Sequence, residues 1–150
     1  TYDVYLCTWS NIHPGTDGSY FWVRMEVGGS FVSSSDYRYG SFWMSSSGSY
    51  PGGNHLSNSA THIVTTYNGT SDAAAEPKSG YLYLFNPSST SMWKNMIWKE
   101  TGMQHDGYLY STNGSGLLEK TEAVTGLQFL FSSAGTIASG TVRLYGLANS

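Results

Sequence analysis

Apolar and polar side chains alternate with a period of two along much of the chain. The clearest alternation lies in residues 20–27, where Phe21, Val23, Met25 and Val27 are separated by Trp22, Arg24 and Glu26. This period places successive side chains on opposite faces of a β-strand. The segment therefore predicts a half-buried strand that ends at Gly28-Gly29. Residues 80–85 repeat the pattern, with Tyr81, Tyr83 and Phe85 alternating against Leu82 and Leu84.

Further strand-like segments follow one another with turn-forming residues between them. We expect strands at 2–9, 31–33, 36–44, 61–67, 92–100, 107–111, 126–132 and 140–146. Residues 10–18, 45–59 and 68–79 are rich in Gly, Ser, Asn, Asp or Pro and predict loops. Asn113-Gly114 predicts a turn, because both residues tolerate a positive φ. The last two strands, 126–132 and 140–146, are expected to form a closing hairpin.

The composition supports an all-β fold. Aromatic residues make up 15% of the 150 residues and charged residues only 11%. Tyr, Trp, Phe, Val and Thr favour a pleated, half-buried surface, whereas helix surfaces are usually rich in charged residues. Roughly nine or ten short strands predict a two-sheet antiparallel β-sandwich, jelly-roll-like, in one domain over residues 1–150.

Charge and hydropathy narrow the classes of partner. The formal net charge is −3 and there are only 7 Lys and Arg residues, so a nucleic-acid partner is not expected. No run of 18 apolar residues is present, so we expect no membrane-spanning helix. Cys7 is the single cysteine, which excludes a disulfide within the chain.

Candidate catalytic and metal-binding groups are scattered. His105-Asp106 is the one adjacent imidazole–carboxylate pair, but it lies between glycines and favours a turn over a catalytic dyad. The four histidines show no metal-ligand spacing, and Glu119 and Glu122 flank Lys120 in the manner of a solvated edge. The sequence therefore assigns no catalytic residue, no metal ligand and no cofactor.

The aromatic residues are the strongest binding candidates. Trp22 lies opposite the apolar face of its own strand, and the aromatic total exceeds what one small core needs. Tyr and Trp together with Ser, Gly and Asn are typical of adaptable binding surfaces. Two interpretations stay open, a ligand or subunit interface and ordinary core packing. The candidates are Tyr20, Trp22, Tyr37, Tyr39, Trp43, Tyr50, Trp93 and Trp98.

The C-terminal stretch resembles a known group of proteins. Residues 125–133 read TGLQFLFSS and residues 135–147 read GTIASGTVRLYGL. This ending is similar to that of a family of bacteriophage virion proteins that close with a hairpin of the pattern SSG-x-I-x-SGT-x-x-LYG. Residues 14–18 and 80–87 are similar to the family as well, whereas residues 134–136 depart from its more common Gly-Asn.

The resemblance implies a jelly-roll module on the surface of a virion, as capsid decoration or as part of a tail fibre or appendage. It carries over no catalytic residue, so a non-enzymatic structural protein is expected. Its expected partners are other virion proteins and copies of itself, with a trimer among the homo-oligomers considered. Two alternatives stay open. One is a carbohydrate-binding module that holds a host-surface glycan on Tyr20 and Trp22, with residues 45–59 as a rim, and the other is a polysaccharide hydrolase.

Overall fold

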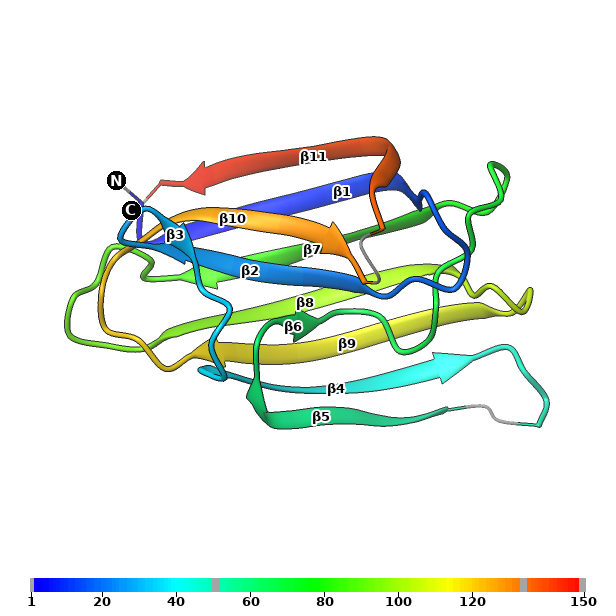
Figure 1. Ribbon diagram of the computed structural model, residues 1–150, viewed down its shortest axis with the longest axis horizontal. Coiled ribbons are helices and arrows are strands. Elements are labelled where there is room, and N and C mark those ends of the chain that lie inside the picture. Colours follow the sequence, from blue (N-terminus) through cyan, green and yellow to red (C-terminus); the bar gives the residue numbers. More distant parts are fainter. Residues whose placement is uncertain (1, 50–51, 133–134, 149–150) are drawn as a thin grey trace.

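The computed structural model describes residues 2–49, 52–132 and 135–148, which form two antiparallel sheets packed face to face (Figure 1). The described residues contain eleven strands and no helix. In chain order the strands are β1 Val4–Pro14, β2 Phe21–Val27, β3 Ser30–Phe31, β4 Tyr37–Ser45, β5 Gly52–Ala60, β6 Ile63–Val64, β7 Lys78–Phe85, β8 Lys94–Met103, β9 Leu109–Leu118, β10 Val124–Phe131 and β11 Ile137–Leu147.

The two sheets differ in width. The large sheet has seven strands in the order β11-β1-β7-β8-β9-β4-β5. The small sheet has four strands: β2 pairs with β10 along one side, and with β3 and β6 along the other. Figure 1 shows β10, β2, β3 and β6 in front of the large sheet, with β11 at the top and β5 at the bottom. The predicted two-sheet antiparallel sandwich is confirmed.

In β2 and β7, the two strands predicted from alternation, one face is buried between the sheets and the other is at least partly exposed. In β2, Phe21, Val23 and Met25 are fully buried between the sheets, while Trp22 and Arg24 are only partly covered. In β7, Leu82 and Leu84 are buried and Tyr81 is exposed. Both predictions are confirmed, because in each strand the apolar side chains at every second position face the opposing sheet.

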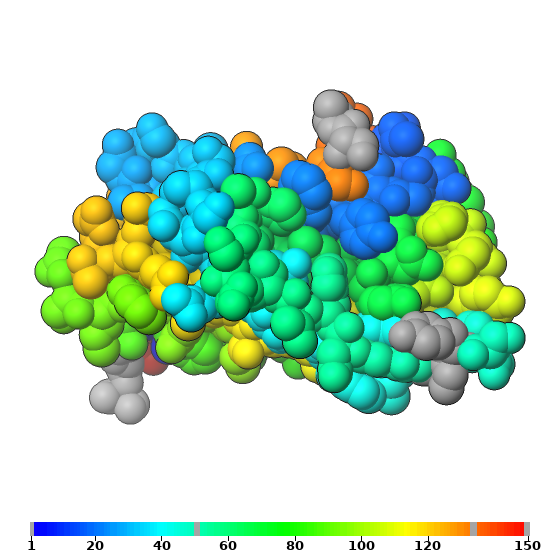
Figure 2. Space-filling view, turned by 60° about the horizontal axis from the view of Figure 1, so that its bottom comes forward, coloured from blue at the N-terminus to red at the C-terminus, as the bar shows by residue number. Residues whose placement is uncertain are grey.

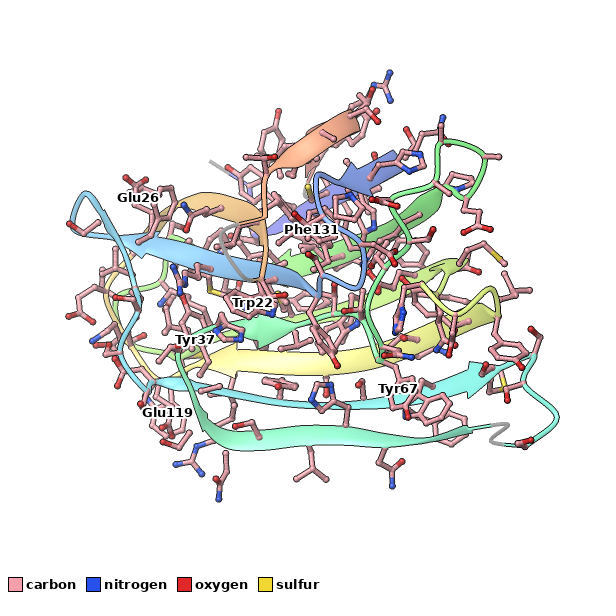
Figure 3. The ribbon with its side chains drawn as sticks, turned by 45° about the vertical axis from the view of Figure 1, so that its right-hand side comes forward. Trp22, Glu26, Tyr37, Tyr67, Glu119 and Phe131 are labelled. Atoms are coloured by element: carbon pink, nitrogen blue, oxygen red, sulfur yellow. The ribbon has the colours of Figure 1, made fainter. Side chains whose placement is uncertain are left out.

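The core is built from aromatic and aliphatic side chains of both sheets. Trp9 of β1 packs on Phe21 of β2, with ring centroids 5.7 Å apart, and Phe131 of β10 lies 5.0 Å from the same Phe21 ring. Tyr37 of β4 links the two sheets. The backbone N–H of Met25 donates to the Tyr37 hydroxyl at 2.8 Å, and that hydroxyl donates to the Val32 carbonyl at 3.3 Å. Figure 3 labels Tyr37 and Phe131 among the side chains between the sheets.

The predicted closing hairpin is wrong. Residues 126–132 and 140–146 do form strands, but β10 pairs with β2 in the small sheet while β11 pairs with β1 in the large sheet. The connection between them crosses from one sheet to the other, and its residues 133–134 lie outside the described residues. A pattern of period two identifies a strand and its two faces, but it does not say which strand lies alongside.

Three predicted loops or turns are also corrected. The first strand continues through residues 10–14, and residues 52–60, predicted as irregular, form the edge strand β5. Asn113-Gly114 lies inside β9. A Cβ at Gly114 would come within 2.2 Å of the Trp98 indole, so glycine is required there for close packing between neighbouring strands.

Candidate functional site

The outer face of the large sheet, which points away from the small sheet, is continuous across all seven strands. The pairing register places Tyr145, Leu6, Tyr83, Ile97, Ser115, Gly40 and Leu56 in one row from β11 to β5. Directly paired residues share a face in an antiparallel sheet. Because Met96 and Trp98 beside Ile97 are buried, this row lies on the uncovered side.

This outer face, called the assembly face below, carries an unusual number of exposed apolar side chains. Leu56 is 72% exposed, Phe42 52% and Ile97 45%. Such side chains are ordinarily scattered singly over a soluble surface, and a contiguous set marks an interaction site. The large apolar residues exposed on this face are Phe42, Met44, Leu56, Tyr81, Ile97, Leu109, Tyr145 and Leu147.

A hollow of about 640 Å³ lies within the assembly face. Gly40 and Ser115 are paired at its floor, and their small side chains leave the surface low between β4 and β9. Ile97 and Phe85 stand on one side and Arg38 on the other. Arg38 is held by Glu119, with its Nη2 2.7 Å from the carboxylate Oε1. The hollow thus combines apolar walls with one fixed cation at its rim.

The edge strand β11 is the second uncovered region. All of its residues, Ile137 to Leu147, are exposed, although the strand pairs with β1 along its length. Leu144 is 59% exposed and Val142 39%, yet both point to the same side of the sheet as the buried Cys7 and Trp9. The small sheet does not extend over β11, so its apolar residues remain uncovered on both faces.

A buried polar cluster lies between the two sheets. The Lys78 Nζ is 3.1 Å from Glu100 Oε1 and 4.4 Å from the centre of the Phe21 ring. Thr65 donates to Glu100 Oε2 at 3.0 Å, and the Tyr110 hydroxyl donates to Oε1 at 3.4 Å. Burial lowers the pKa of Lys78 to about 8 and raises the pKa of Glu100, while each group opposes the shift of the other. Because these side chains have essentially no exposed surface, no substrate reaches them, and the cluster is structural.

The aromatic residues proposed from the sequence divide into several groups. Tyr37, Trp43 and Trp98 are buried within the chain, so the expectation of exposed rings is wrong for these three. Tyr20 and Trp93 are exposed and Tyr39 is partly buried, but the three lie in different parts of the fold. Tyr50 lies outside the described residues.

Trp22 is partly covered by one neighbour. The His62 imidazole stacks on its indole with centroids 3.7 Å apart. Burial, reinforced by the nearby Arg24 charge, lowers the pKa of His62 to about 4, so the imidazole is neutral at pH 7. The stack occupies one face of the indole, which reduces the platform proposed for Tyr20 and Trp22. Figure 3 shows Trp22 on β2.

Several apolar residues of the assembly face were not singled out from the sequence. Phe42, Met44 and Leu56 lie on β4 and β5, where Gly and Ser are abundant and the alternation is weak. Ile97 lies in the stretch MIWKE, where three apolar residues precede two charged ones, so the sequence pattern does not reveal which face of the strand another sheet covers. Figure 2, which brings the β5 edge forward, shows the surface of β4 and β5 in cyan and blue-green.

The remaining candidates for chemistry lie in structural positions. His105 and Asp106 are exposed in a turn closed by the Gly107 N–H, which donates to the Gln104 carbonyl at 2.9 Å, so the turn interpretation is confirmed. Within the described residues, no group of three or more His, Cys, Asp or Glu side chains is placed to hold a metal ion.

The part of the chain that the structure describes contains no helix of the length and apolar character needed to cross a membrane.

Comparison with known proteins finds no family model, no curated protein and no solved structure that matches this chain. The features that bear on function are therefore the assembly face, the exposed strand β11 and the resemblance of residues 125–147.

Proposed function

We propose that this chain is a non-enzymatic structural module of a virion surface, which docks on neighbouring virion proteins through the assembly face. The observation that carries the docking role is the set of eight exposed large apolar side chains on one continuous sheet face. Exposing such a surface to water is unfavourable, and burying it against a partner is the common resolution. The virion setting, as capsid decoration or tail fibre component, is supported by the resemblance of residues 125–147.

The low charge of the assembly face fits a protein partner. Its cations are Arg38, Lys99 and Arg143, and Arg38 is already paired with Glu119. The centre of a protein interface is typically depleted in charge and enriched in aromatic residues and Met. Phe42, Met44 and Tyr81 meet this description.

The test is incorporation of the chain into particles. We expect the chain in purified particles, and we expect Ile97→Lys to reduce its amount strongly, because a desolvated ammonium is costly at an interface. Met92→Lys is the matched control: Met92 is also about half exposed but lies in the loop before β8, away from the assembly face. Quantitative mass spectrometry of particles measures both. Absence of the unmodified chain from particles, or equal incorporation of both variants, contradicts the proposal.

A second candidate function is glycan binding in the hollow of the assembly face. On β7, Tyr81, Tyr83 and Phe85 form a row of rings with centroid spacings of 5.8 and 6.4 Å, and Phe85 at the end of this row lines the hollow. Aromatic rings beside amide side chains such as Asn95 supply the apolar and hydrogen-bonding contacts that a neutral sugar requires.

Glycan-array binding tests this alternative. Phe85→Ala should abolish binding in the hollow, whereas Tyr20→Ala should leave it unchanged, because Tyr20 lies outside the large sheet just before β2. If Tyr20→Ala abolishes binding and the variant in the hollow does not, the glycan site is on Tyr20 and Trp22 instead. No binding to any glycan would leave protein docking as the only role of this face.

A further inference from the structure

The outer edge of β11 is an unprotected strand edge. Among the described residues β11 pairs with β1 alone, so one row of its backbone N–H and C=O groups faces outward. Edge strands of soluble proteins are usually protected from pairing by charges, Pro, bulges or short length. Here Arg143 is the only charged residue in an eleven-residue strand that contains no Pro. Such an edge favours the addition of another strand.

The regular part of β11 has a well-defined centre. Residues 141–147 pair one to one with residues 4–10 of β1, from Leu147 beside Val4 to Thr141 beside Ser10. Beyond this segment the register shifts, and Gly140 has a φ of 124°. The middle of the regular segment is Leu144, which at 59% is the most exposed apolar side chain of the strand.

We propose that β11 pairs antiparallel with β11 of a second copy of this chain, with Leu144 opposite Leu144 on a two-fold axis. This inference rests on the structural role proposed above. It concerns a different surface, the edge of β11, and says which molecule binds there and in which register. An antiparallel pair of identical strands is self-complementary and generates a closed dimer. The two large sheets then become one continuous sheet.

The residues brought together by this register suit one another. Arg143 lies opposite Tyr145 of the second copy, so its guanidinium can stack on a phenol ring and the two arginines are not directly paired. Val142 lies opposite Gly146, over which the Tyr2 ring of the same copy packs, so the branched side chain faces an aromatic ring. The single charge of β11 therefore has a favourable partner in the second copy.

The surroundings of Leu144 also favour a second copy of the chain. Leu144, Leu84 and Leu127 line a hollow of about 150 Å³ where the small sheet stops short of β11. The two-fold arrangement brings two such hollows together, so each copy covers apolar surface of the other. The opposite edge strand, β5, is composed mainly of Gly, Ser, Asn and His and offers no comparable apolar strip.

The oligomeric state of the purified chain tests the pairing. We expect a dimer by analytical ultracentrifugation, and monomers for both Leu144→Lys and Leu144→Glu, because each substitution places two like charges side by side. Mixing the two variants should restore a one-to-one heterodimer, since Lys then faces Glu. Each homodimer should be weakened by at least about tenfold relative to the mixture. Leu56→Lys on the β5 edge is the matched control and should remain dimeric.

Each alternative result overturns the pairing. A monomeric unmodified chain, a trimer, a dimer that survives Leu144→Lys, or a mixture that stays monomeric contradicts self-pairing at Leu144. Circular dichroism of the variants distinguishes lost pairing from unfolding. Unfolding is not expected, because the Leu144 side chain is largely exposed. If the chain is monomeric but Ile97→Lys still abolishes its incorporation into particles, the pairing is overturned and docking through the assembly face stands.

Discussion

Leu82 and Leu144 occupy equivalent positions on the same face of the same sheet and have opposite environments. Cys7 of β1 pairs with Leu82 on one side and with Leu144 on the other, so a single strand separates the two leucines. Leu82 is fully buried, whereas Leu144 is 59% exposed. The small sheet lies over β7 and ends before β11. The comparison shows that an apolar side chain on a strand is a core residue only where another layer covers it.

The consequence for function follows from this difference. β7 contributes Leu82 and Leu84 to the hydrophobic core of the chain, while β11 has a comparable apolar content and no layer above it. Uncovered apolar surface on an edge strand is the property of an interface. The covered region should therefore control stability, and β11 should control association.

The largest effect on stability is expected at Glu100, in the most deeply covered part of the large sheet. Glu100→Ala removes the counter-charge of the buried Lys78 and should lower the free energy of unfolding by about 3–5 kcal/mol. Arg143→Ala on β11 removes an exposed charge and should change it by about 0.5 kcal/mol or less. Denaturant unfolding measures both. A loss below about 1 kcal/mol for Glu100→Ala would contradict the assigned ion pair.

The next largest effect tests the two leucines directly. Leu82→Ala leaves a cavity under the small sheet and should cost about 2–5 kcal/mol, while Leu144→Ala should cost about 0.5 kcal/mol or less in the monomer. Because dimerisation would add to the apparent stability, Leu144→Ala and the unmodified chain are compared at a protein concentration low enough for both to be monomeric. Equal losses for the two leucines would show that β11 is covered within one chain.

A smaller effect is expected from loosening the contact between the sheets. Tyr37→Phe keeps the ring but removes the hydroxyl that accepts from the Met25 N–H and donates to the Val32 carbonyl. The buried Met25 donor then lacks a partner, which should cost about 1–3 kcal/mol. Amide hydrogen exchange at Met25 provides the local readout, and unchanged protection there would contradict the assigned bond.

The smallest effect concerns Cys7, which lies between the two leucines. Burial raises the pKa of its thiol from an ordinary value of 9.0 to about 12. Above pH 9 the unfolded chain releases this proton while the native chain retains it, so the stabilising contribution is complete below pH 9 and declines as the pH rises toward 12. Cys7→Ala should lose less stability than the unmodified chain between pH 9 and 10, by about 1 kcal/mol or less. Parallel pH dependences would contradict the buried position.

The sequence alone predicted the exposure of some candidate site residues correctly and that of others wrongly. The alternation of residues 80–85 correctly predicted that Tyr81 and Tyr83 share a face opposite Leu82. The excess of aromatic residues made Tyr37, Trp43 and Trp98 candidates for a ligand or subunit interface, but the structure buries all three within the chain. Aromatic side chains are common in cores and in interfaces alike, so residue type does not distinguish the two environments.

The sequence by itself determined the all-β class, the buried face of β2 and most of the strands, because side-chain alternation and turn residues act locally. The tertiary structure decided which strands are neighbours. It placed residues 126–132 and 140–146 in different sheets and made Asn113-Gly114 part of β9, where Trp98 requires a glycine. It also decided that Leu82 is core and Leu144 is surface, because burial depends on the width of the opposing sheet, which no local pattern encodes.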